Sequence, residues 1–278
     1  MKRMSRFILG LVVTMVGLFL LLPILVIIPL SFNPEPYFSF TGKMLQLDPN
    51  GWSLRWYREV VQDPQWRLAF KNSITVAAIV TPIATALGTC AALGLRHLPP
   101  TQRTVVTLFV SAPLIVPIII VAAGTYLLFA PLGLTQSLTG IVLSHISLAA
   151  PFVVITVSGA LTTFDERLLR AAAILGASPV RAFCRVTLPI MAPGVAAGAL
   201  FAFATSFDEA VLTLFLAGYD QRTIPLQMWS GVRDQLSPAV LVVASLLVAA
   251  VSIVMVGLSL HQALSRQRSK QLGYGAEH

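Results

Sequence analysis

The chain has 278 residues, of which 56% are hydrophobic and only 11% are charged, and its mean hydropathy is +0.82. A water-soluble domain of this size carries far more charge on its surface, so this composition excludes an ordinary soluble protein. The net charge of +8 would suit a nucleic-acid partner, but its distribution follows membrane topology instead, as described below. We therefore expect a protein embedded in the lipid bilayer, with no nucleic-acid partner.

Six apolar segments are long enough to cross a bilayer, because a helix rises ~1.5 Å per residue and the hydrocarbon core is ~30 Å thick. They cover residues 7–30, 68–95, 104–129, 140–161, 191–216 and 239–260. The first is longer than the apolar part of a secretory signal and is not followed by a small-residue cleavage site, so we expect it to remain as a helix. The prediction is an all-α, polytopic membrane protein with six transmembrane helices.

The last five of these segments are rich in Gly, Ala, Ser and Thr, the residues through which membrane helices approach one another closely. They also contain five prolines, which indicate kinks or broken turns that neighbouring helices must compensate. The prolines are Pro82, Pro113, Pro117, Pro151 and Pro193. We expect a bundle of closely packed, partly kinked helices.

The orientation follows from the distribution of Lys and Arg, which favour the cytoplasmic side. Placing the N-terminus inside puts twelve of the 19 basic residues in or beside cytoplasmic segments: Lys2, Arg3, Arg6, Arg96, Arg103, Arg167, Arg170, Arg181, Arg185, Arg266, Arg268 and Lys270. Both termini are then cytoplasmic. The predicted organisation is a first helix with an extracytoplasmic interfacial segment (1–67), a five-helix core (68–262) and a cytoplasmic tail (263–278).

The interfacial segment, residues 33–67, is polar and contains several Trp and Tyr side chains, which prefer the headgroup level. Residues 53–61 within it are typical of a short amphipathic helix lying on the surface.

The loop between the fourth and fifth segments, residues 163–189, predicts a helix, a turn and a second helix. Asp165 can cap the first helix, and Gly176 is placed to end it, because glycine adopts the left-handed conformation at least cost. Ser178 can cap the second helix, with Pro179 at its first position. Leu188 and Pro189 are expected to end that helix. Such a loop is either an amphipathic connector lying on the headgroups or a docking surface for a cytoplasmic partner.

The same residues carry a resemblance. The loop resembles the EAA loop of permease subunits of binding-protein-dependent ABC importers, the MetI-like permease family, whose pattern is Glu-Ala-Ala, three residues, Gly, nine residues and Ile-x-Leu-Pro. This chain keeps the spacing with Ala171, Ala172, Gly176, Val186, Leu188 and Pro189. Arg170 stands where the family usually has glutamate and reverses the charge there. In the family this loop is the coupling helix that docks on an ATPase subunit.

Other segments resemble the spermidine/putrescine branch of this family. They are Asn72-Ser73 at the start of the second apolar segment, Ser206-Phe207-Asp208-Glu209, and Arg222-Thr223-Ile224-Pro225. The resemblance implies a multi-pass permease of the cytoplasmic (inner) membrane that imports polyamines. Opines, amines such as agmatine or aminobutyrate, and ferric ion are the alternative substrates.

The resemblance also implies a set of partners: two ATPase subunits, a second permease chain and an extracytoplasmic substrate-binding protein. The chain contains no G-x-x-x-x-G-K-[ST] phosphate-binding pattern. We therefore expect no catalytic residues and no bound cofactor in this chain, with ATP and Mg²⁺ held by the partner ATPases. Its Cys and His residues show no metal-ligand spacing, so no metal site is expected.

Asp208 and Glu209 are candidate pathway residues, because carboxylates at membrane depth are costly. With Ser206 and Phe207 they can offer a carboxylate and an aromatic face to an ammonium group. The competing interpretation is that they reach water or pair with an arginine. If the segment is one continuous helix, the two carboxylates point about 100° apart. His145 in the fourth segment is interpreted as a buried, hydrogen-bonded side chain rather than a proton relay.

Two other classes remain open at this point. A secondary transporter would need ionisable groups near the membrane midplane and an internal repeat. A membrane assembly subunit would need neither the carboxylates nor the 163–189 loop.

Overall fold

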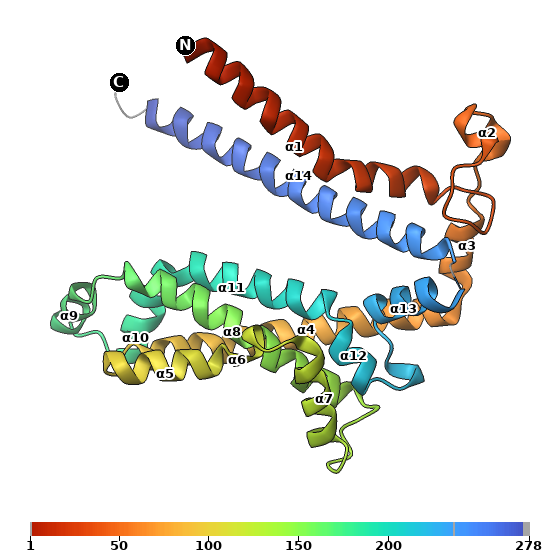
Figure 1. Ribbon diagram of the computed structural model, residues 1–278. Coiled ribbons are helices and arrows are strands. Elements are labelled where there is room, and N and C mark those ends of the chain that lie inside the picture. Colours follow the sequence, from red (N-terminus) through yellow and green to blue (C-terminus); the bar gives the residue numbers. More distant parts are fainter. Residues whose placement is uncertain (1, 236, 275–278) are drawn as a thin grey trace. The chain divides into compact units, whose positions relative to one another are not determined.

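The computed structural model describes residues 2–235 and 237–274, and these residues divide into two compact units. The first unit combines Met1–Asp63 with Ser230–His278, and the second is Pro64–Trp229. Within the described residues the regular structure is entirely helical (Figure 1). The domain boundaries expected near residues 67 and 262 stay a prediction, and residues 275–278 of the expected tail lie outside the described part.

Within the described residues, five helices are long and apolar enough to cross a membrane. They are Arg6–Leu30, Pro64–Leu95, Leu138–Thr162, Pro179–Asp208 and Ala239–Gly257. The all-α membrane fold is thus confirmed, while the number of six crossings stays a prediction.

The first unit contains two long helices and the segment that follows the first of them. Its elements are α1 (Lys2–Leu30), α2 (Gly42–Leu45), η1 (Pro49–Gly51), α3 (Arg55–Gln62), η4 (Gly231–Gln235) and α14 (Ala239–Tyr274). Helix α14 contacts both α1 and α3, and α1 and α14 run antiparallel beside each other (Figure 1). The apolar surface of α1 is largely exposed, as expected for a helix that lipid surrounds.

The connection after α1 folds onto itself through aromatic side chains. The Trp56 indole Nε1 donates a hydrogen bond to the Asn33 carbonyl oxygen at 2.9 Å, and Phe32 stacks on Tyr57 with ring centroids 5.0 Å apart. The short amphipathic helix expected near residues 53–61 is confirmed as α3. Trp56 is buried in protein, so this ring packs within the unit, and its depth in the bilayer stays a prediction.

The second unit holds the remaining elements. They are α4 (Pro64–Leu95), α5 (Pro100–Val110), α6 (Ala112–Ile115), α7 (Ile118–Phe129), α8 (Leu138–Thr162), α9 (Arg167–Ile174), α10 (Pro179–Ala182), η2 (Phe183–Thr187), α11 (Leu188–Asp208), α12 (Val211–Leu216), η3 (Tyr219–Gln221) and α13 (Ile224–Ser230), the last of which ends at the unit boundary.

The core of this unit is the mutual packing of α4, α8 and α11. Small residues permit it: a Cβ added to Gly88 of α4 would lie 2.6 Å from the Val153 Cβ of α8, and one added to Gly198 of α11 would lie 3.2 Å from the Val153 Cα. Val153 is fully buried at this crossing. The prediction of close packing through small residues is therefore confirmed.

The apolar segment expected at 104–129 is not one helix. Helix α5 ends at Val110, α6 ends at Ile115, and α7 starts only after Pro117. Val116 has an extended backbone with ψ 135°, because a residue that precedes proline is driven out of the helical region. Two prolines in close succession thus interrupt a segment whose hydropathy suggested a continuous span.

Candidate functional site

The 163–189 loop forms two helical arms joined at a glycine. The Asp165 carboxylate accepts the Arg167 N–H at 2.9 Å, although the N-cap residue of α9 is Glu166, one residue later than expected. Gly176 has φ +80°, the left-handed conformation predicted for it after the helix. Ser178 Oγ accepts the Arg181 N–H at the start of α10, with Pro179 in the first helical position. The local architecture expected from the sequence is confirmed up to this point.

The expected stop at Leu188-Pro189 is wrong. Helix α10 passes through the π-helical turn η2 directly into α11, so that Pro179–Asp208 forms one long helical stretch. Proline lacks an N–H and usually interrupts the bonding of the preceding turn. Here the wider turn η2 lies immediately before Pro189, and the helix continues past it. The second arm of the loop is therefore the beginning of a membrane helix.

The tip of the loop presents apolar side chains without cover. Ile174 and Leu175 are each 86% exposed and Val180 is 73% exposed. Four arginines on the same loop are also exposed: Arg167, Arg170, Arg181 and Arg185. Exposed apolar side chains beside exposed charged ones are typical of a protein docking surface.

The residues that match the EAA pattern are distributed along both arms. Arg170 and Ala171 are exposed on α9, and Ala172 is half-buried. Val186 is half-buried in η2, and Leu188 and Pro189 are exposed at the start of α11. Arg170 also lines a cavity of about 700 Å³ beneath the loop, together with Arg96 and Glu166.

Arg96, at the end of α4, makes two contacts with the beginning of this loop. Its Nη2 lies 2.7 Å from the Glu166 Oε1, and its guanidinium carbon lies 4.9 Å from the centre of the Phe164 ring. The sequence predicted only that Arg96 lies on the cytoplasmic side, because no local pattern indicates a partner 70 residues away.

The segment that contains the candidate carboxylates is broken at Glu209. Helix α11 ends at Asp208, and Glu209 has an extended backbone with ψ 112°. The expectation of a continuous helix with two carboxylates 100° apart is therefore wrong. The Glu209 Oε1 accepts the backbone N–H groups of Val211 and Leu212 at 2.6 and 2.8 Å, so this carboxylate starts α12. It neither reaches an arginine nor extends away from the protein.

Asp208 is exposed at the end of α11. Phe207, the residue before it, stacks on Phe203 one turn earlier, with ring centroids 5.4 Å apart. Ser206 is 5% exposed and points away from this pair, toward the interior of the unit, where it contacts His145. Of the four candidate pathway residues, Phe207 and Asp208 are accessible, whereas Ser206 and Glu209 are engaged within the protein.

His145 of α8 holds the break between α11 and α12. Its Nδ1 lies 3.1 Å from the Ser206 Oγ, and its Nε2 lies 3.2 Å from the Thr213 Oγ1. The side chain is 1% exposed. The interpretation of His145 as a buried, hydrogen-bonded residue is confirmed, and Thr213 is a partner that the sequence did not reveal.

Two motifs that resemble the polyamine branch lie against each other. The Asn72 side-chain amide donates to the carbonyl oxygens of Asp220 and Arg222 at 2.8 and 2.9 Å, and the Ser73 Oγ accepts the Ile224 N–H at 2.8 Å. The N-terminal part of α4 is thus fastened to the segment 220–224. The sequence singled out the polar pair Asn72-Ser73 at the start of an apolar segment, but only the fold shows that residues 220–224 are its partners.

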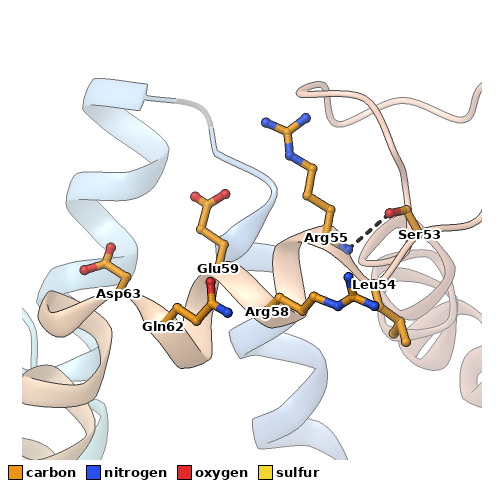
Figure 2. A pocket seen from close by; sticks show the side chains of 7 residues that line it. All are labelled: Ser53, Leu54, Arg55, Arg58, Glu59, Gln62 and Asp63. Carbon is orange, nitrogen blue, oxygen red and sulfur yellow. Dashed lines mark hydrogen bonds between the residues drawn. The ribbon is translucent and has the colours of Figure 1, made fainter.

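A separate polar hollow of about 610 Å³ lies along α3 in the first unit. Figure 2 shows Arg55 and Glu59 extending in one direction from the helix and Arg58 in another, with Ser53 Oγ accepting the Arg55 N–H at 3.1 Å. Trp56 and Val60 are buried on the same helix. This face is the polar side of an amphipathic helix.

The sequence model of the family described as "Binding-protein-dependent transport system inner membrane component" matches residues 84–270. The chain belongs to this family. It is accordingly a multi-pass protein of the inner membrane and a permease subunit of an ABC importer.

Two relatives from Escherichia coli (strain K12) resemble it over most of their length. The chain is 31% identical over 243 residues to the putrescine transport system permease protein PotI, and the matched region covers 85% of this chain and 84% of PotI. It is 30% identical over 266 residues to the spermidine/putrescine transport system permease protein PotC, and the matched region covers 96% of this chain and 97% of PotC.

Among solved structures, the fold is similar to that of a bacterial ABC transporter involved in the import of the acidic polysaccharide alginate. The TM-score is 0.70 at 18% sequence identity, over 94% of this chain and 96% of that one. At this identity the likeness shows the MetI-like permease fold alone.

Proposed function

We propose that this chain forms half of the translocation pathway of an ATP-driven polyamine importer and receives the power stroke through its 163–189 loop. The observation that carries the proposal is the tip of that loop, where Ile174 and Leu175 are each 86% exposed, on a loop that also exposes four arginines. A short amphipathic helix with an uncovered apolar side fits a groove on a partner protein. The EAA-type spacing from Ala171 to Pro189 supports an ATPase subunit as that partner.

The remaining partners follow from the same proposal. A second permease chain completes the pathway, an extracytoplasmic binding protein delivers the substrate, and two ATPase subunits bind and hydrolyse ATP with Mg²⁺. Both termini and the 163–189 loop lie on the cytoplasmic side, as the distribution of Lys and Arg favours. Rocking of the permease halves as the ATPases close gives alternating access.

Polyamine is the substrate class that the relatives support, since PotI and PotC carry putrescine and spermidine/putrescine in their names. In this chain, Asp208 is exposed beside the stacked rings of Phe203 and Phe207. A carboxylate next to an aromatic face attracts an ammonium group by charge and by the ring quadrupole. We assign Phe207 and Asp208 to the polyamine pathway on this basis.

Docking is tested by co-purification of the tagged permease with its ATPase subunits. Leu175→Asp places a charge on the apolar tip and should remove most of the ATPase from the purified complex. The matched control is Leu132→Asp, a leucine that is 62% exposed in the connection before α8, at the other end of that helix from the loop. Undiminished co-purification of the Leu175→Asp variant would refute docking through this loop.

The substrate assignment is tested by uptake of radiolabelled putrescine and spermidine. Asp208→Asn removes the charge with little change in shape, and we expect the apparent KM for both polyamines to rise by about tenfold, the weight of one well-placed cation contact. Uptake that is insensitive to Asp208→Asn removes Asp208 from the pathway, and a complex that transports neither polyamine removes the substrate class.

A further inference from the structure

We infer that Arg96 is a positioning residue that ties the 163–189 loop to the end of α4, so that displacement of the loop by an ATPase subunit moves α4 with it. The inference rests on the proposed function of the loop. It adds a specific mechanical link that neither the loop pattern nor the family membership supplies.

The contacts of Arg96 are specific. The residue directly follows Leu95, the last residue of α4, yet its side chain is only 16% exposed because it lies across the start of the loop. Its Nη2 is 2.7 Å from the Glu166 Oε1, and the guanidinium carbon is 4.9 Å from the Phe164 ring centre.

The two partners of Arg96 both lie at the start of the loop but differ in burial. Phe164 is 7% exposed and lies in the same hydrophobic cluster as Ala92 of α4. Glu166, whose side chain is 67% exposed, immediately precedes α9, the first arm of the loop. The Arg96 guanidinium therefore joins a fixed point in the core to the base of the arm that would bind the ATPase.

The loop has room to move at this place. The cavity of about 700 Å³ beneath it is lined by Arg96, Glu166 and Arg170, and by Phe183 on the second arm. Leu169 still packs at the edge of the core cluster, so α9 is anchored at one point and open beside it. Because close packing does not fix the tilt of the arm, the polar contact of Arg96 sets it.

Helix α4 carries the displacement further. It is a single helix of 32 residues, or about 48 Å long at ~1.5 Å per residue. Near its N-terminus, Asn72 and Ser73 bind the segment 220–224 through three hydrogen bonds. A pull on Arg96 is thereby transmitted along α4 to the opposite end of the unit.

The test uses the complete importer, with both permease chains, the ATPase subunits and the loaded binding protein, in proteoliposomes. ATP hydrolysis and polyamine uptake are measured in the same sample, and their ratio is the readout. Arg96→Ala should lower the uptake per ATP hydrolysed by about two- to fivefold, the size expected of one exposed ion pair, while the ATPase subunits still co-purify in full. Arg103→Ala is the control, since Arg103 is exposed on α5.

Charge exchange separates positioning from general stability. Arg96→Glu alone should uncouple the importer, and adding Glu166→Arg should restore more than half of the lost ratio. Arg96→Lys, which keeps the charge, should fall between wild type and Arg96→Ala. Should Arg96→Ala fail to fold, Glu166→Gln removes the pair while leaving Arg96 on the Phe164 ring, and it should lower the ratio in the same direction.

An unchanged ratio in Arg96→Ala or, where that variant does not fold, in Glu166→Gln overturns the inference. Loss of the ATPase subunits from either variant overturns it too, because Arg96 would then serve docking itself. Failure of the proposed function looks different: the wild-type complex would show no polyamine uptake, or Leu175→Asp would leave the ATPase bound.

Discussion

The two ends of α4 are fastened in different ways. At one end, Asn72 and Ser73 are each 3% exposed and bind backbone groups of residues 220–224. At the other end, Arg96 holds the 163–189 loop through an ion pair whose acidic partner is 67% exposed. Buried hydrogen bonds are expensive to break, at about 1–3 kcal/mol for each unsatisfied group. An exposed ion pair contributes only about 0–1 kcal/mol.

We call the contacts of Asn72 and Ser73 with residues 220–224 the fixed joint of α4, and the contact of Arg96 with the loop its adjustable joint. The fixed joint keeps α4 and the segment 220–224 together in every state, since separating them would leave polar groups unpaired inside the protein. The adjustable joint lies beside a cavity and beneath the loop that we propose receives the ATPase. Energy from a partner would therefore change the adjustable end first.

The largest effect should come from separating α4 from its neighbours. Gly88→Val places side-chain atoms where even a Cβ would lie 2.6 Å from the Val153 Cβ. Overpacking of this kind costs about 1–3 kcal/mol or more, so the purified variant should melt at a clearly lower temperature. Gly94→Val on the same helix is the control, because nothing lies within 4 Å of its added Cβ. Equal melting temperatures would contradict the close helix crossing.

The next effect concerns the fixed joint. Asn72→Leu leaves the carbonyl oxygens of Asp220 and Arg222 without their donor, and we expect a loss of about 2 kcal/mol in unfolding free energy. Thermal melting in detergent measures it, and the loss should persist in high salt because the groups are uncharged. Asn50→Ala, at an exposed position, should change the melting temperature far less. An equal fall in melting temperature in both variants would show that the fixed joint stabilises the protein no more than an exposed polar residue does.

The smallest effect concerns the adjustable joint. Glu166→Gln should cost less than about 1 kcal/mol in stability, and the difference from wild type should vanish near 1 M salt, where the Debye length is about 3 Å. Glu59→Gln, at an exposed position on α3, provides the comparison. A large loss that salt leaves unchanged would make this joint as rigid as the other one and would remove the contrast.

Local sequence patterns predicted local structure well. Gly176 and Ser178 were assigned correctly because a glycine after an amphipathic helix and a serine before proline act within a few residues. The position of His145 in an apolar segment likewise predicted a buried, hydrogen-bonded side chain. These features need no knowledge of the neighbouring helices.

Other features depended on the surroundings. Pro82 and Pro151 lie inside continuous helices, whereas Pro117 adjoins a break, and hydropathy treats all three alike. The continuation past Pro189 requires the π-helical turn before it, which no local pattern indicated. The partners of Asn72 lie about 150 residues further along the chain, so only the fold could reveal them.

The central claim is that the 163–189 loop touches an ATPase subunit. A photo-crosslinking residue at position 175, in the assembled importer, tests it most directly, with position 132 as the control site. The account predicts a crosslinked product between this chain and the ATPase from position 175 and none from position 132. An intact complex that gives no ATPase crosslink from position 175, or equal crosslinks from both positions, would contradict it.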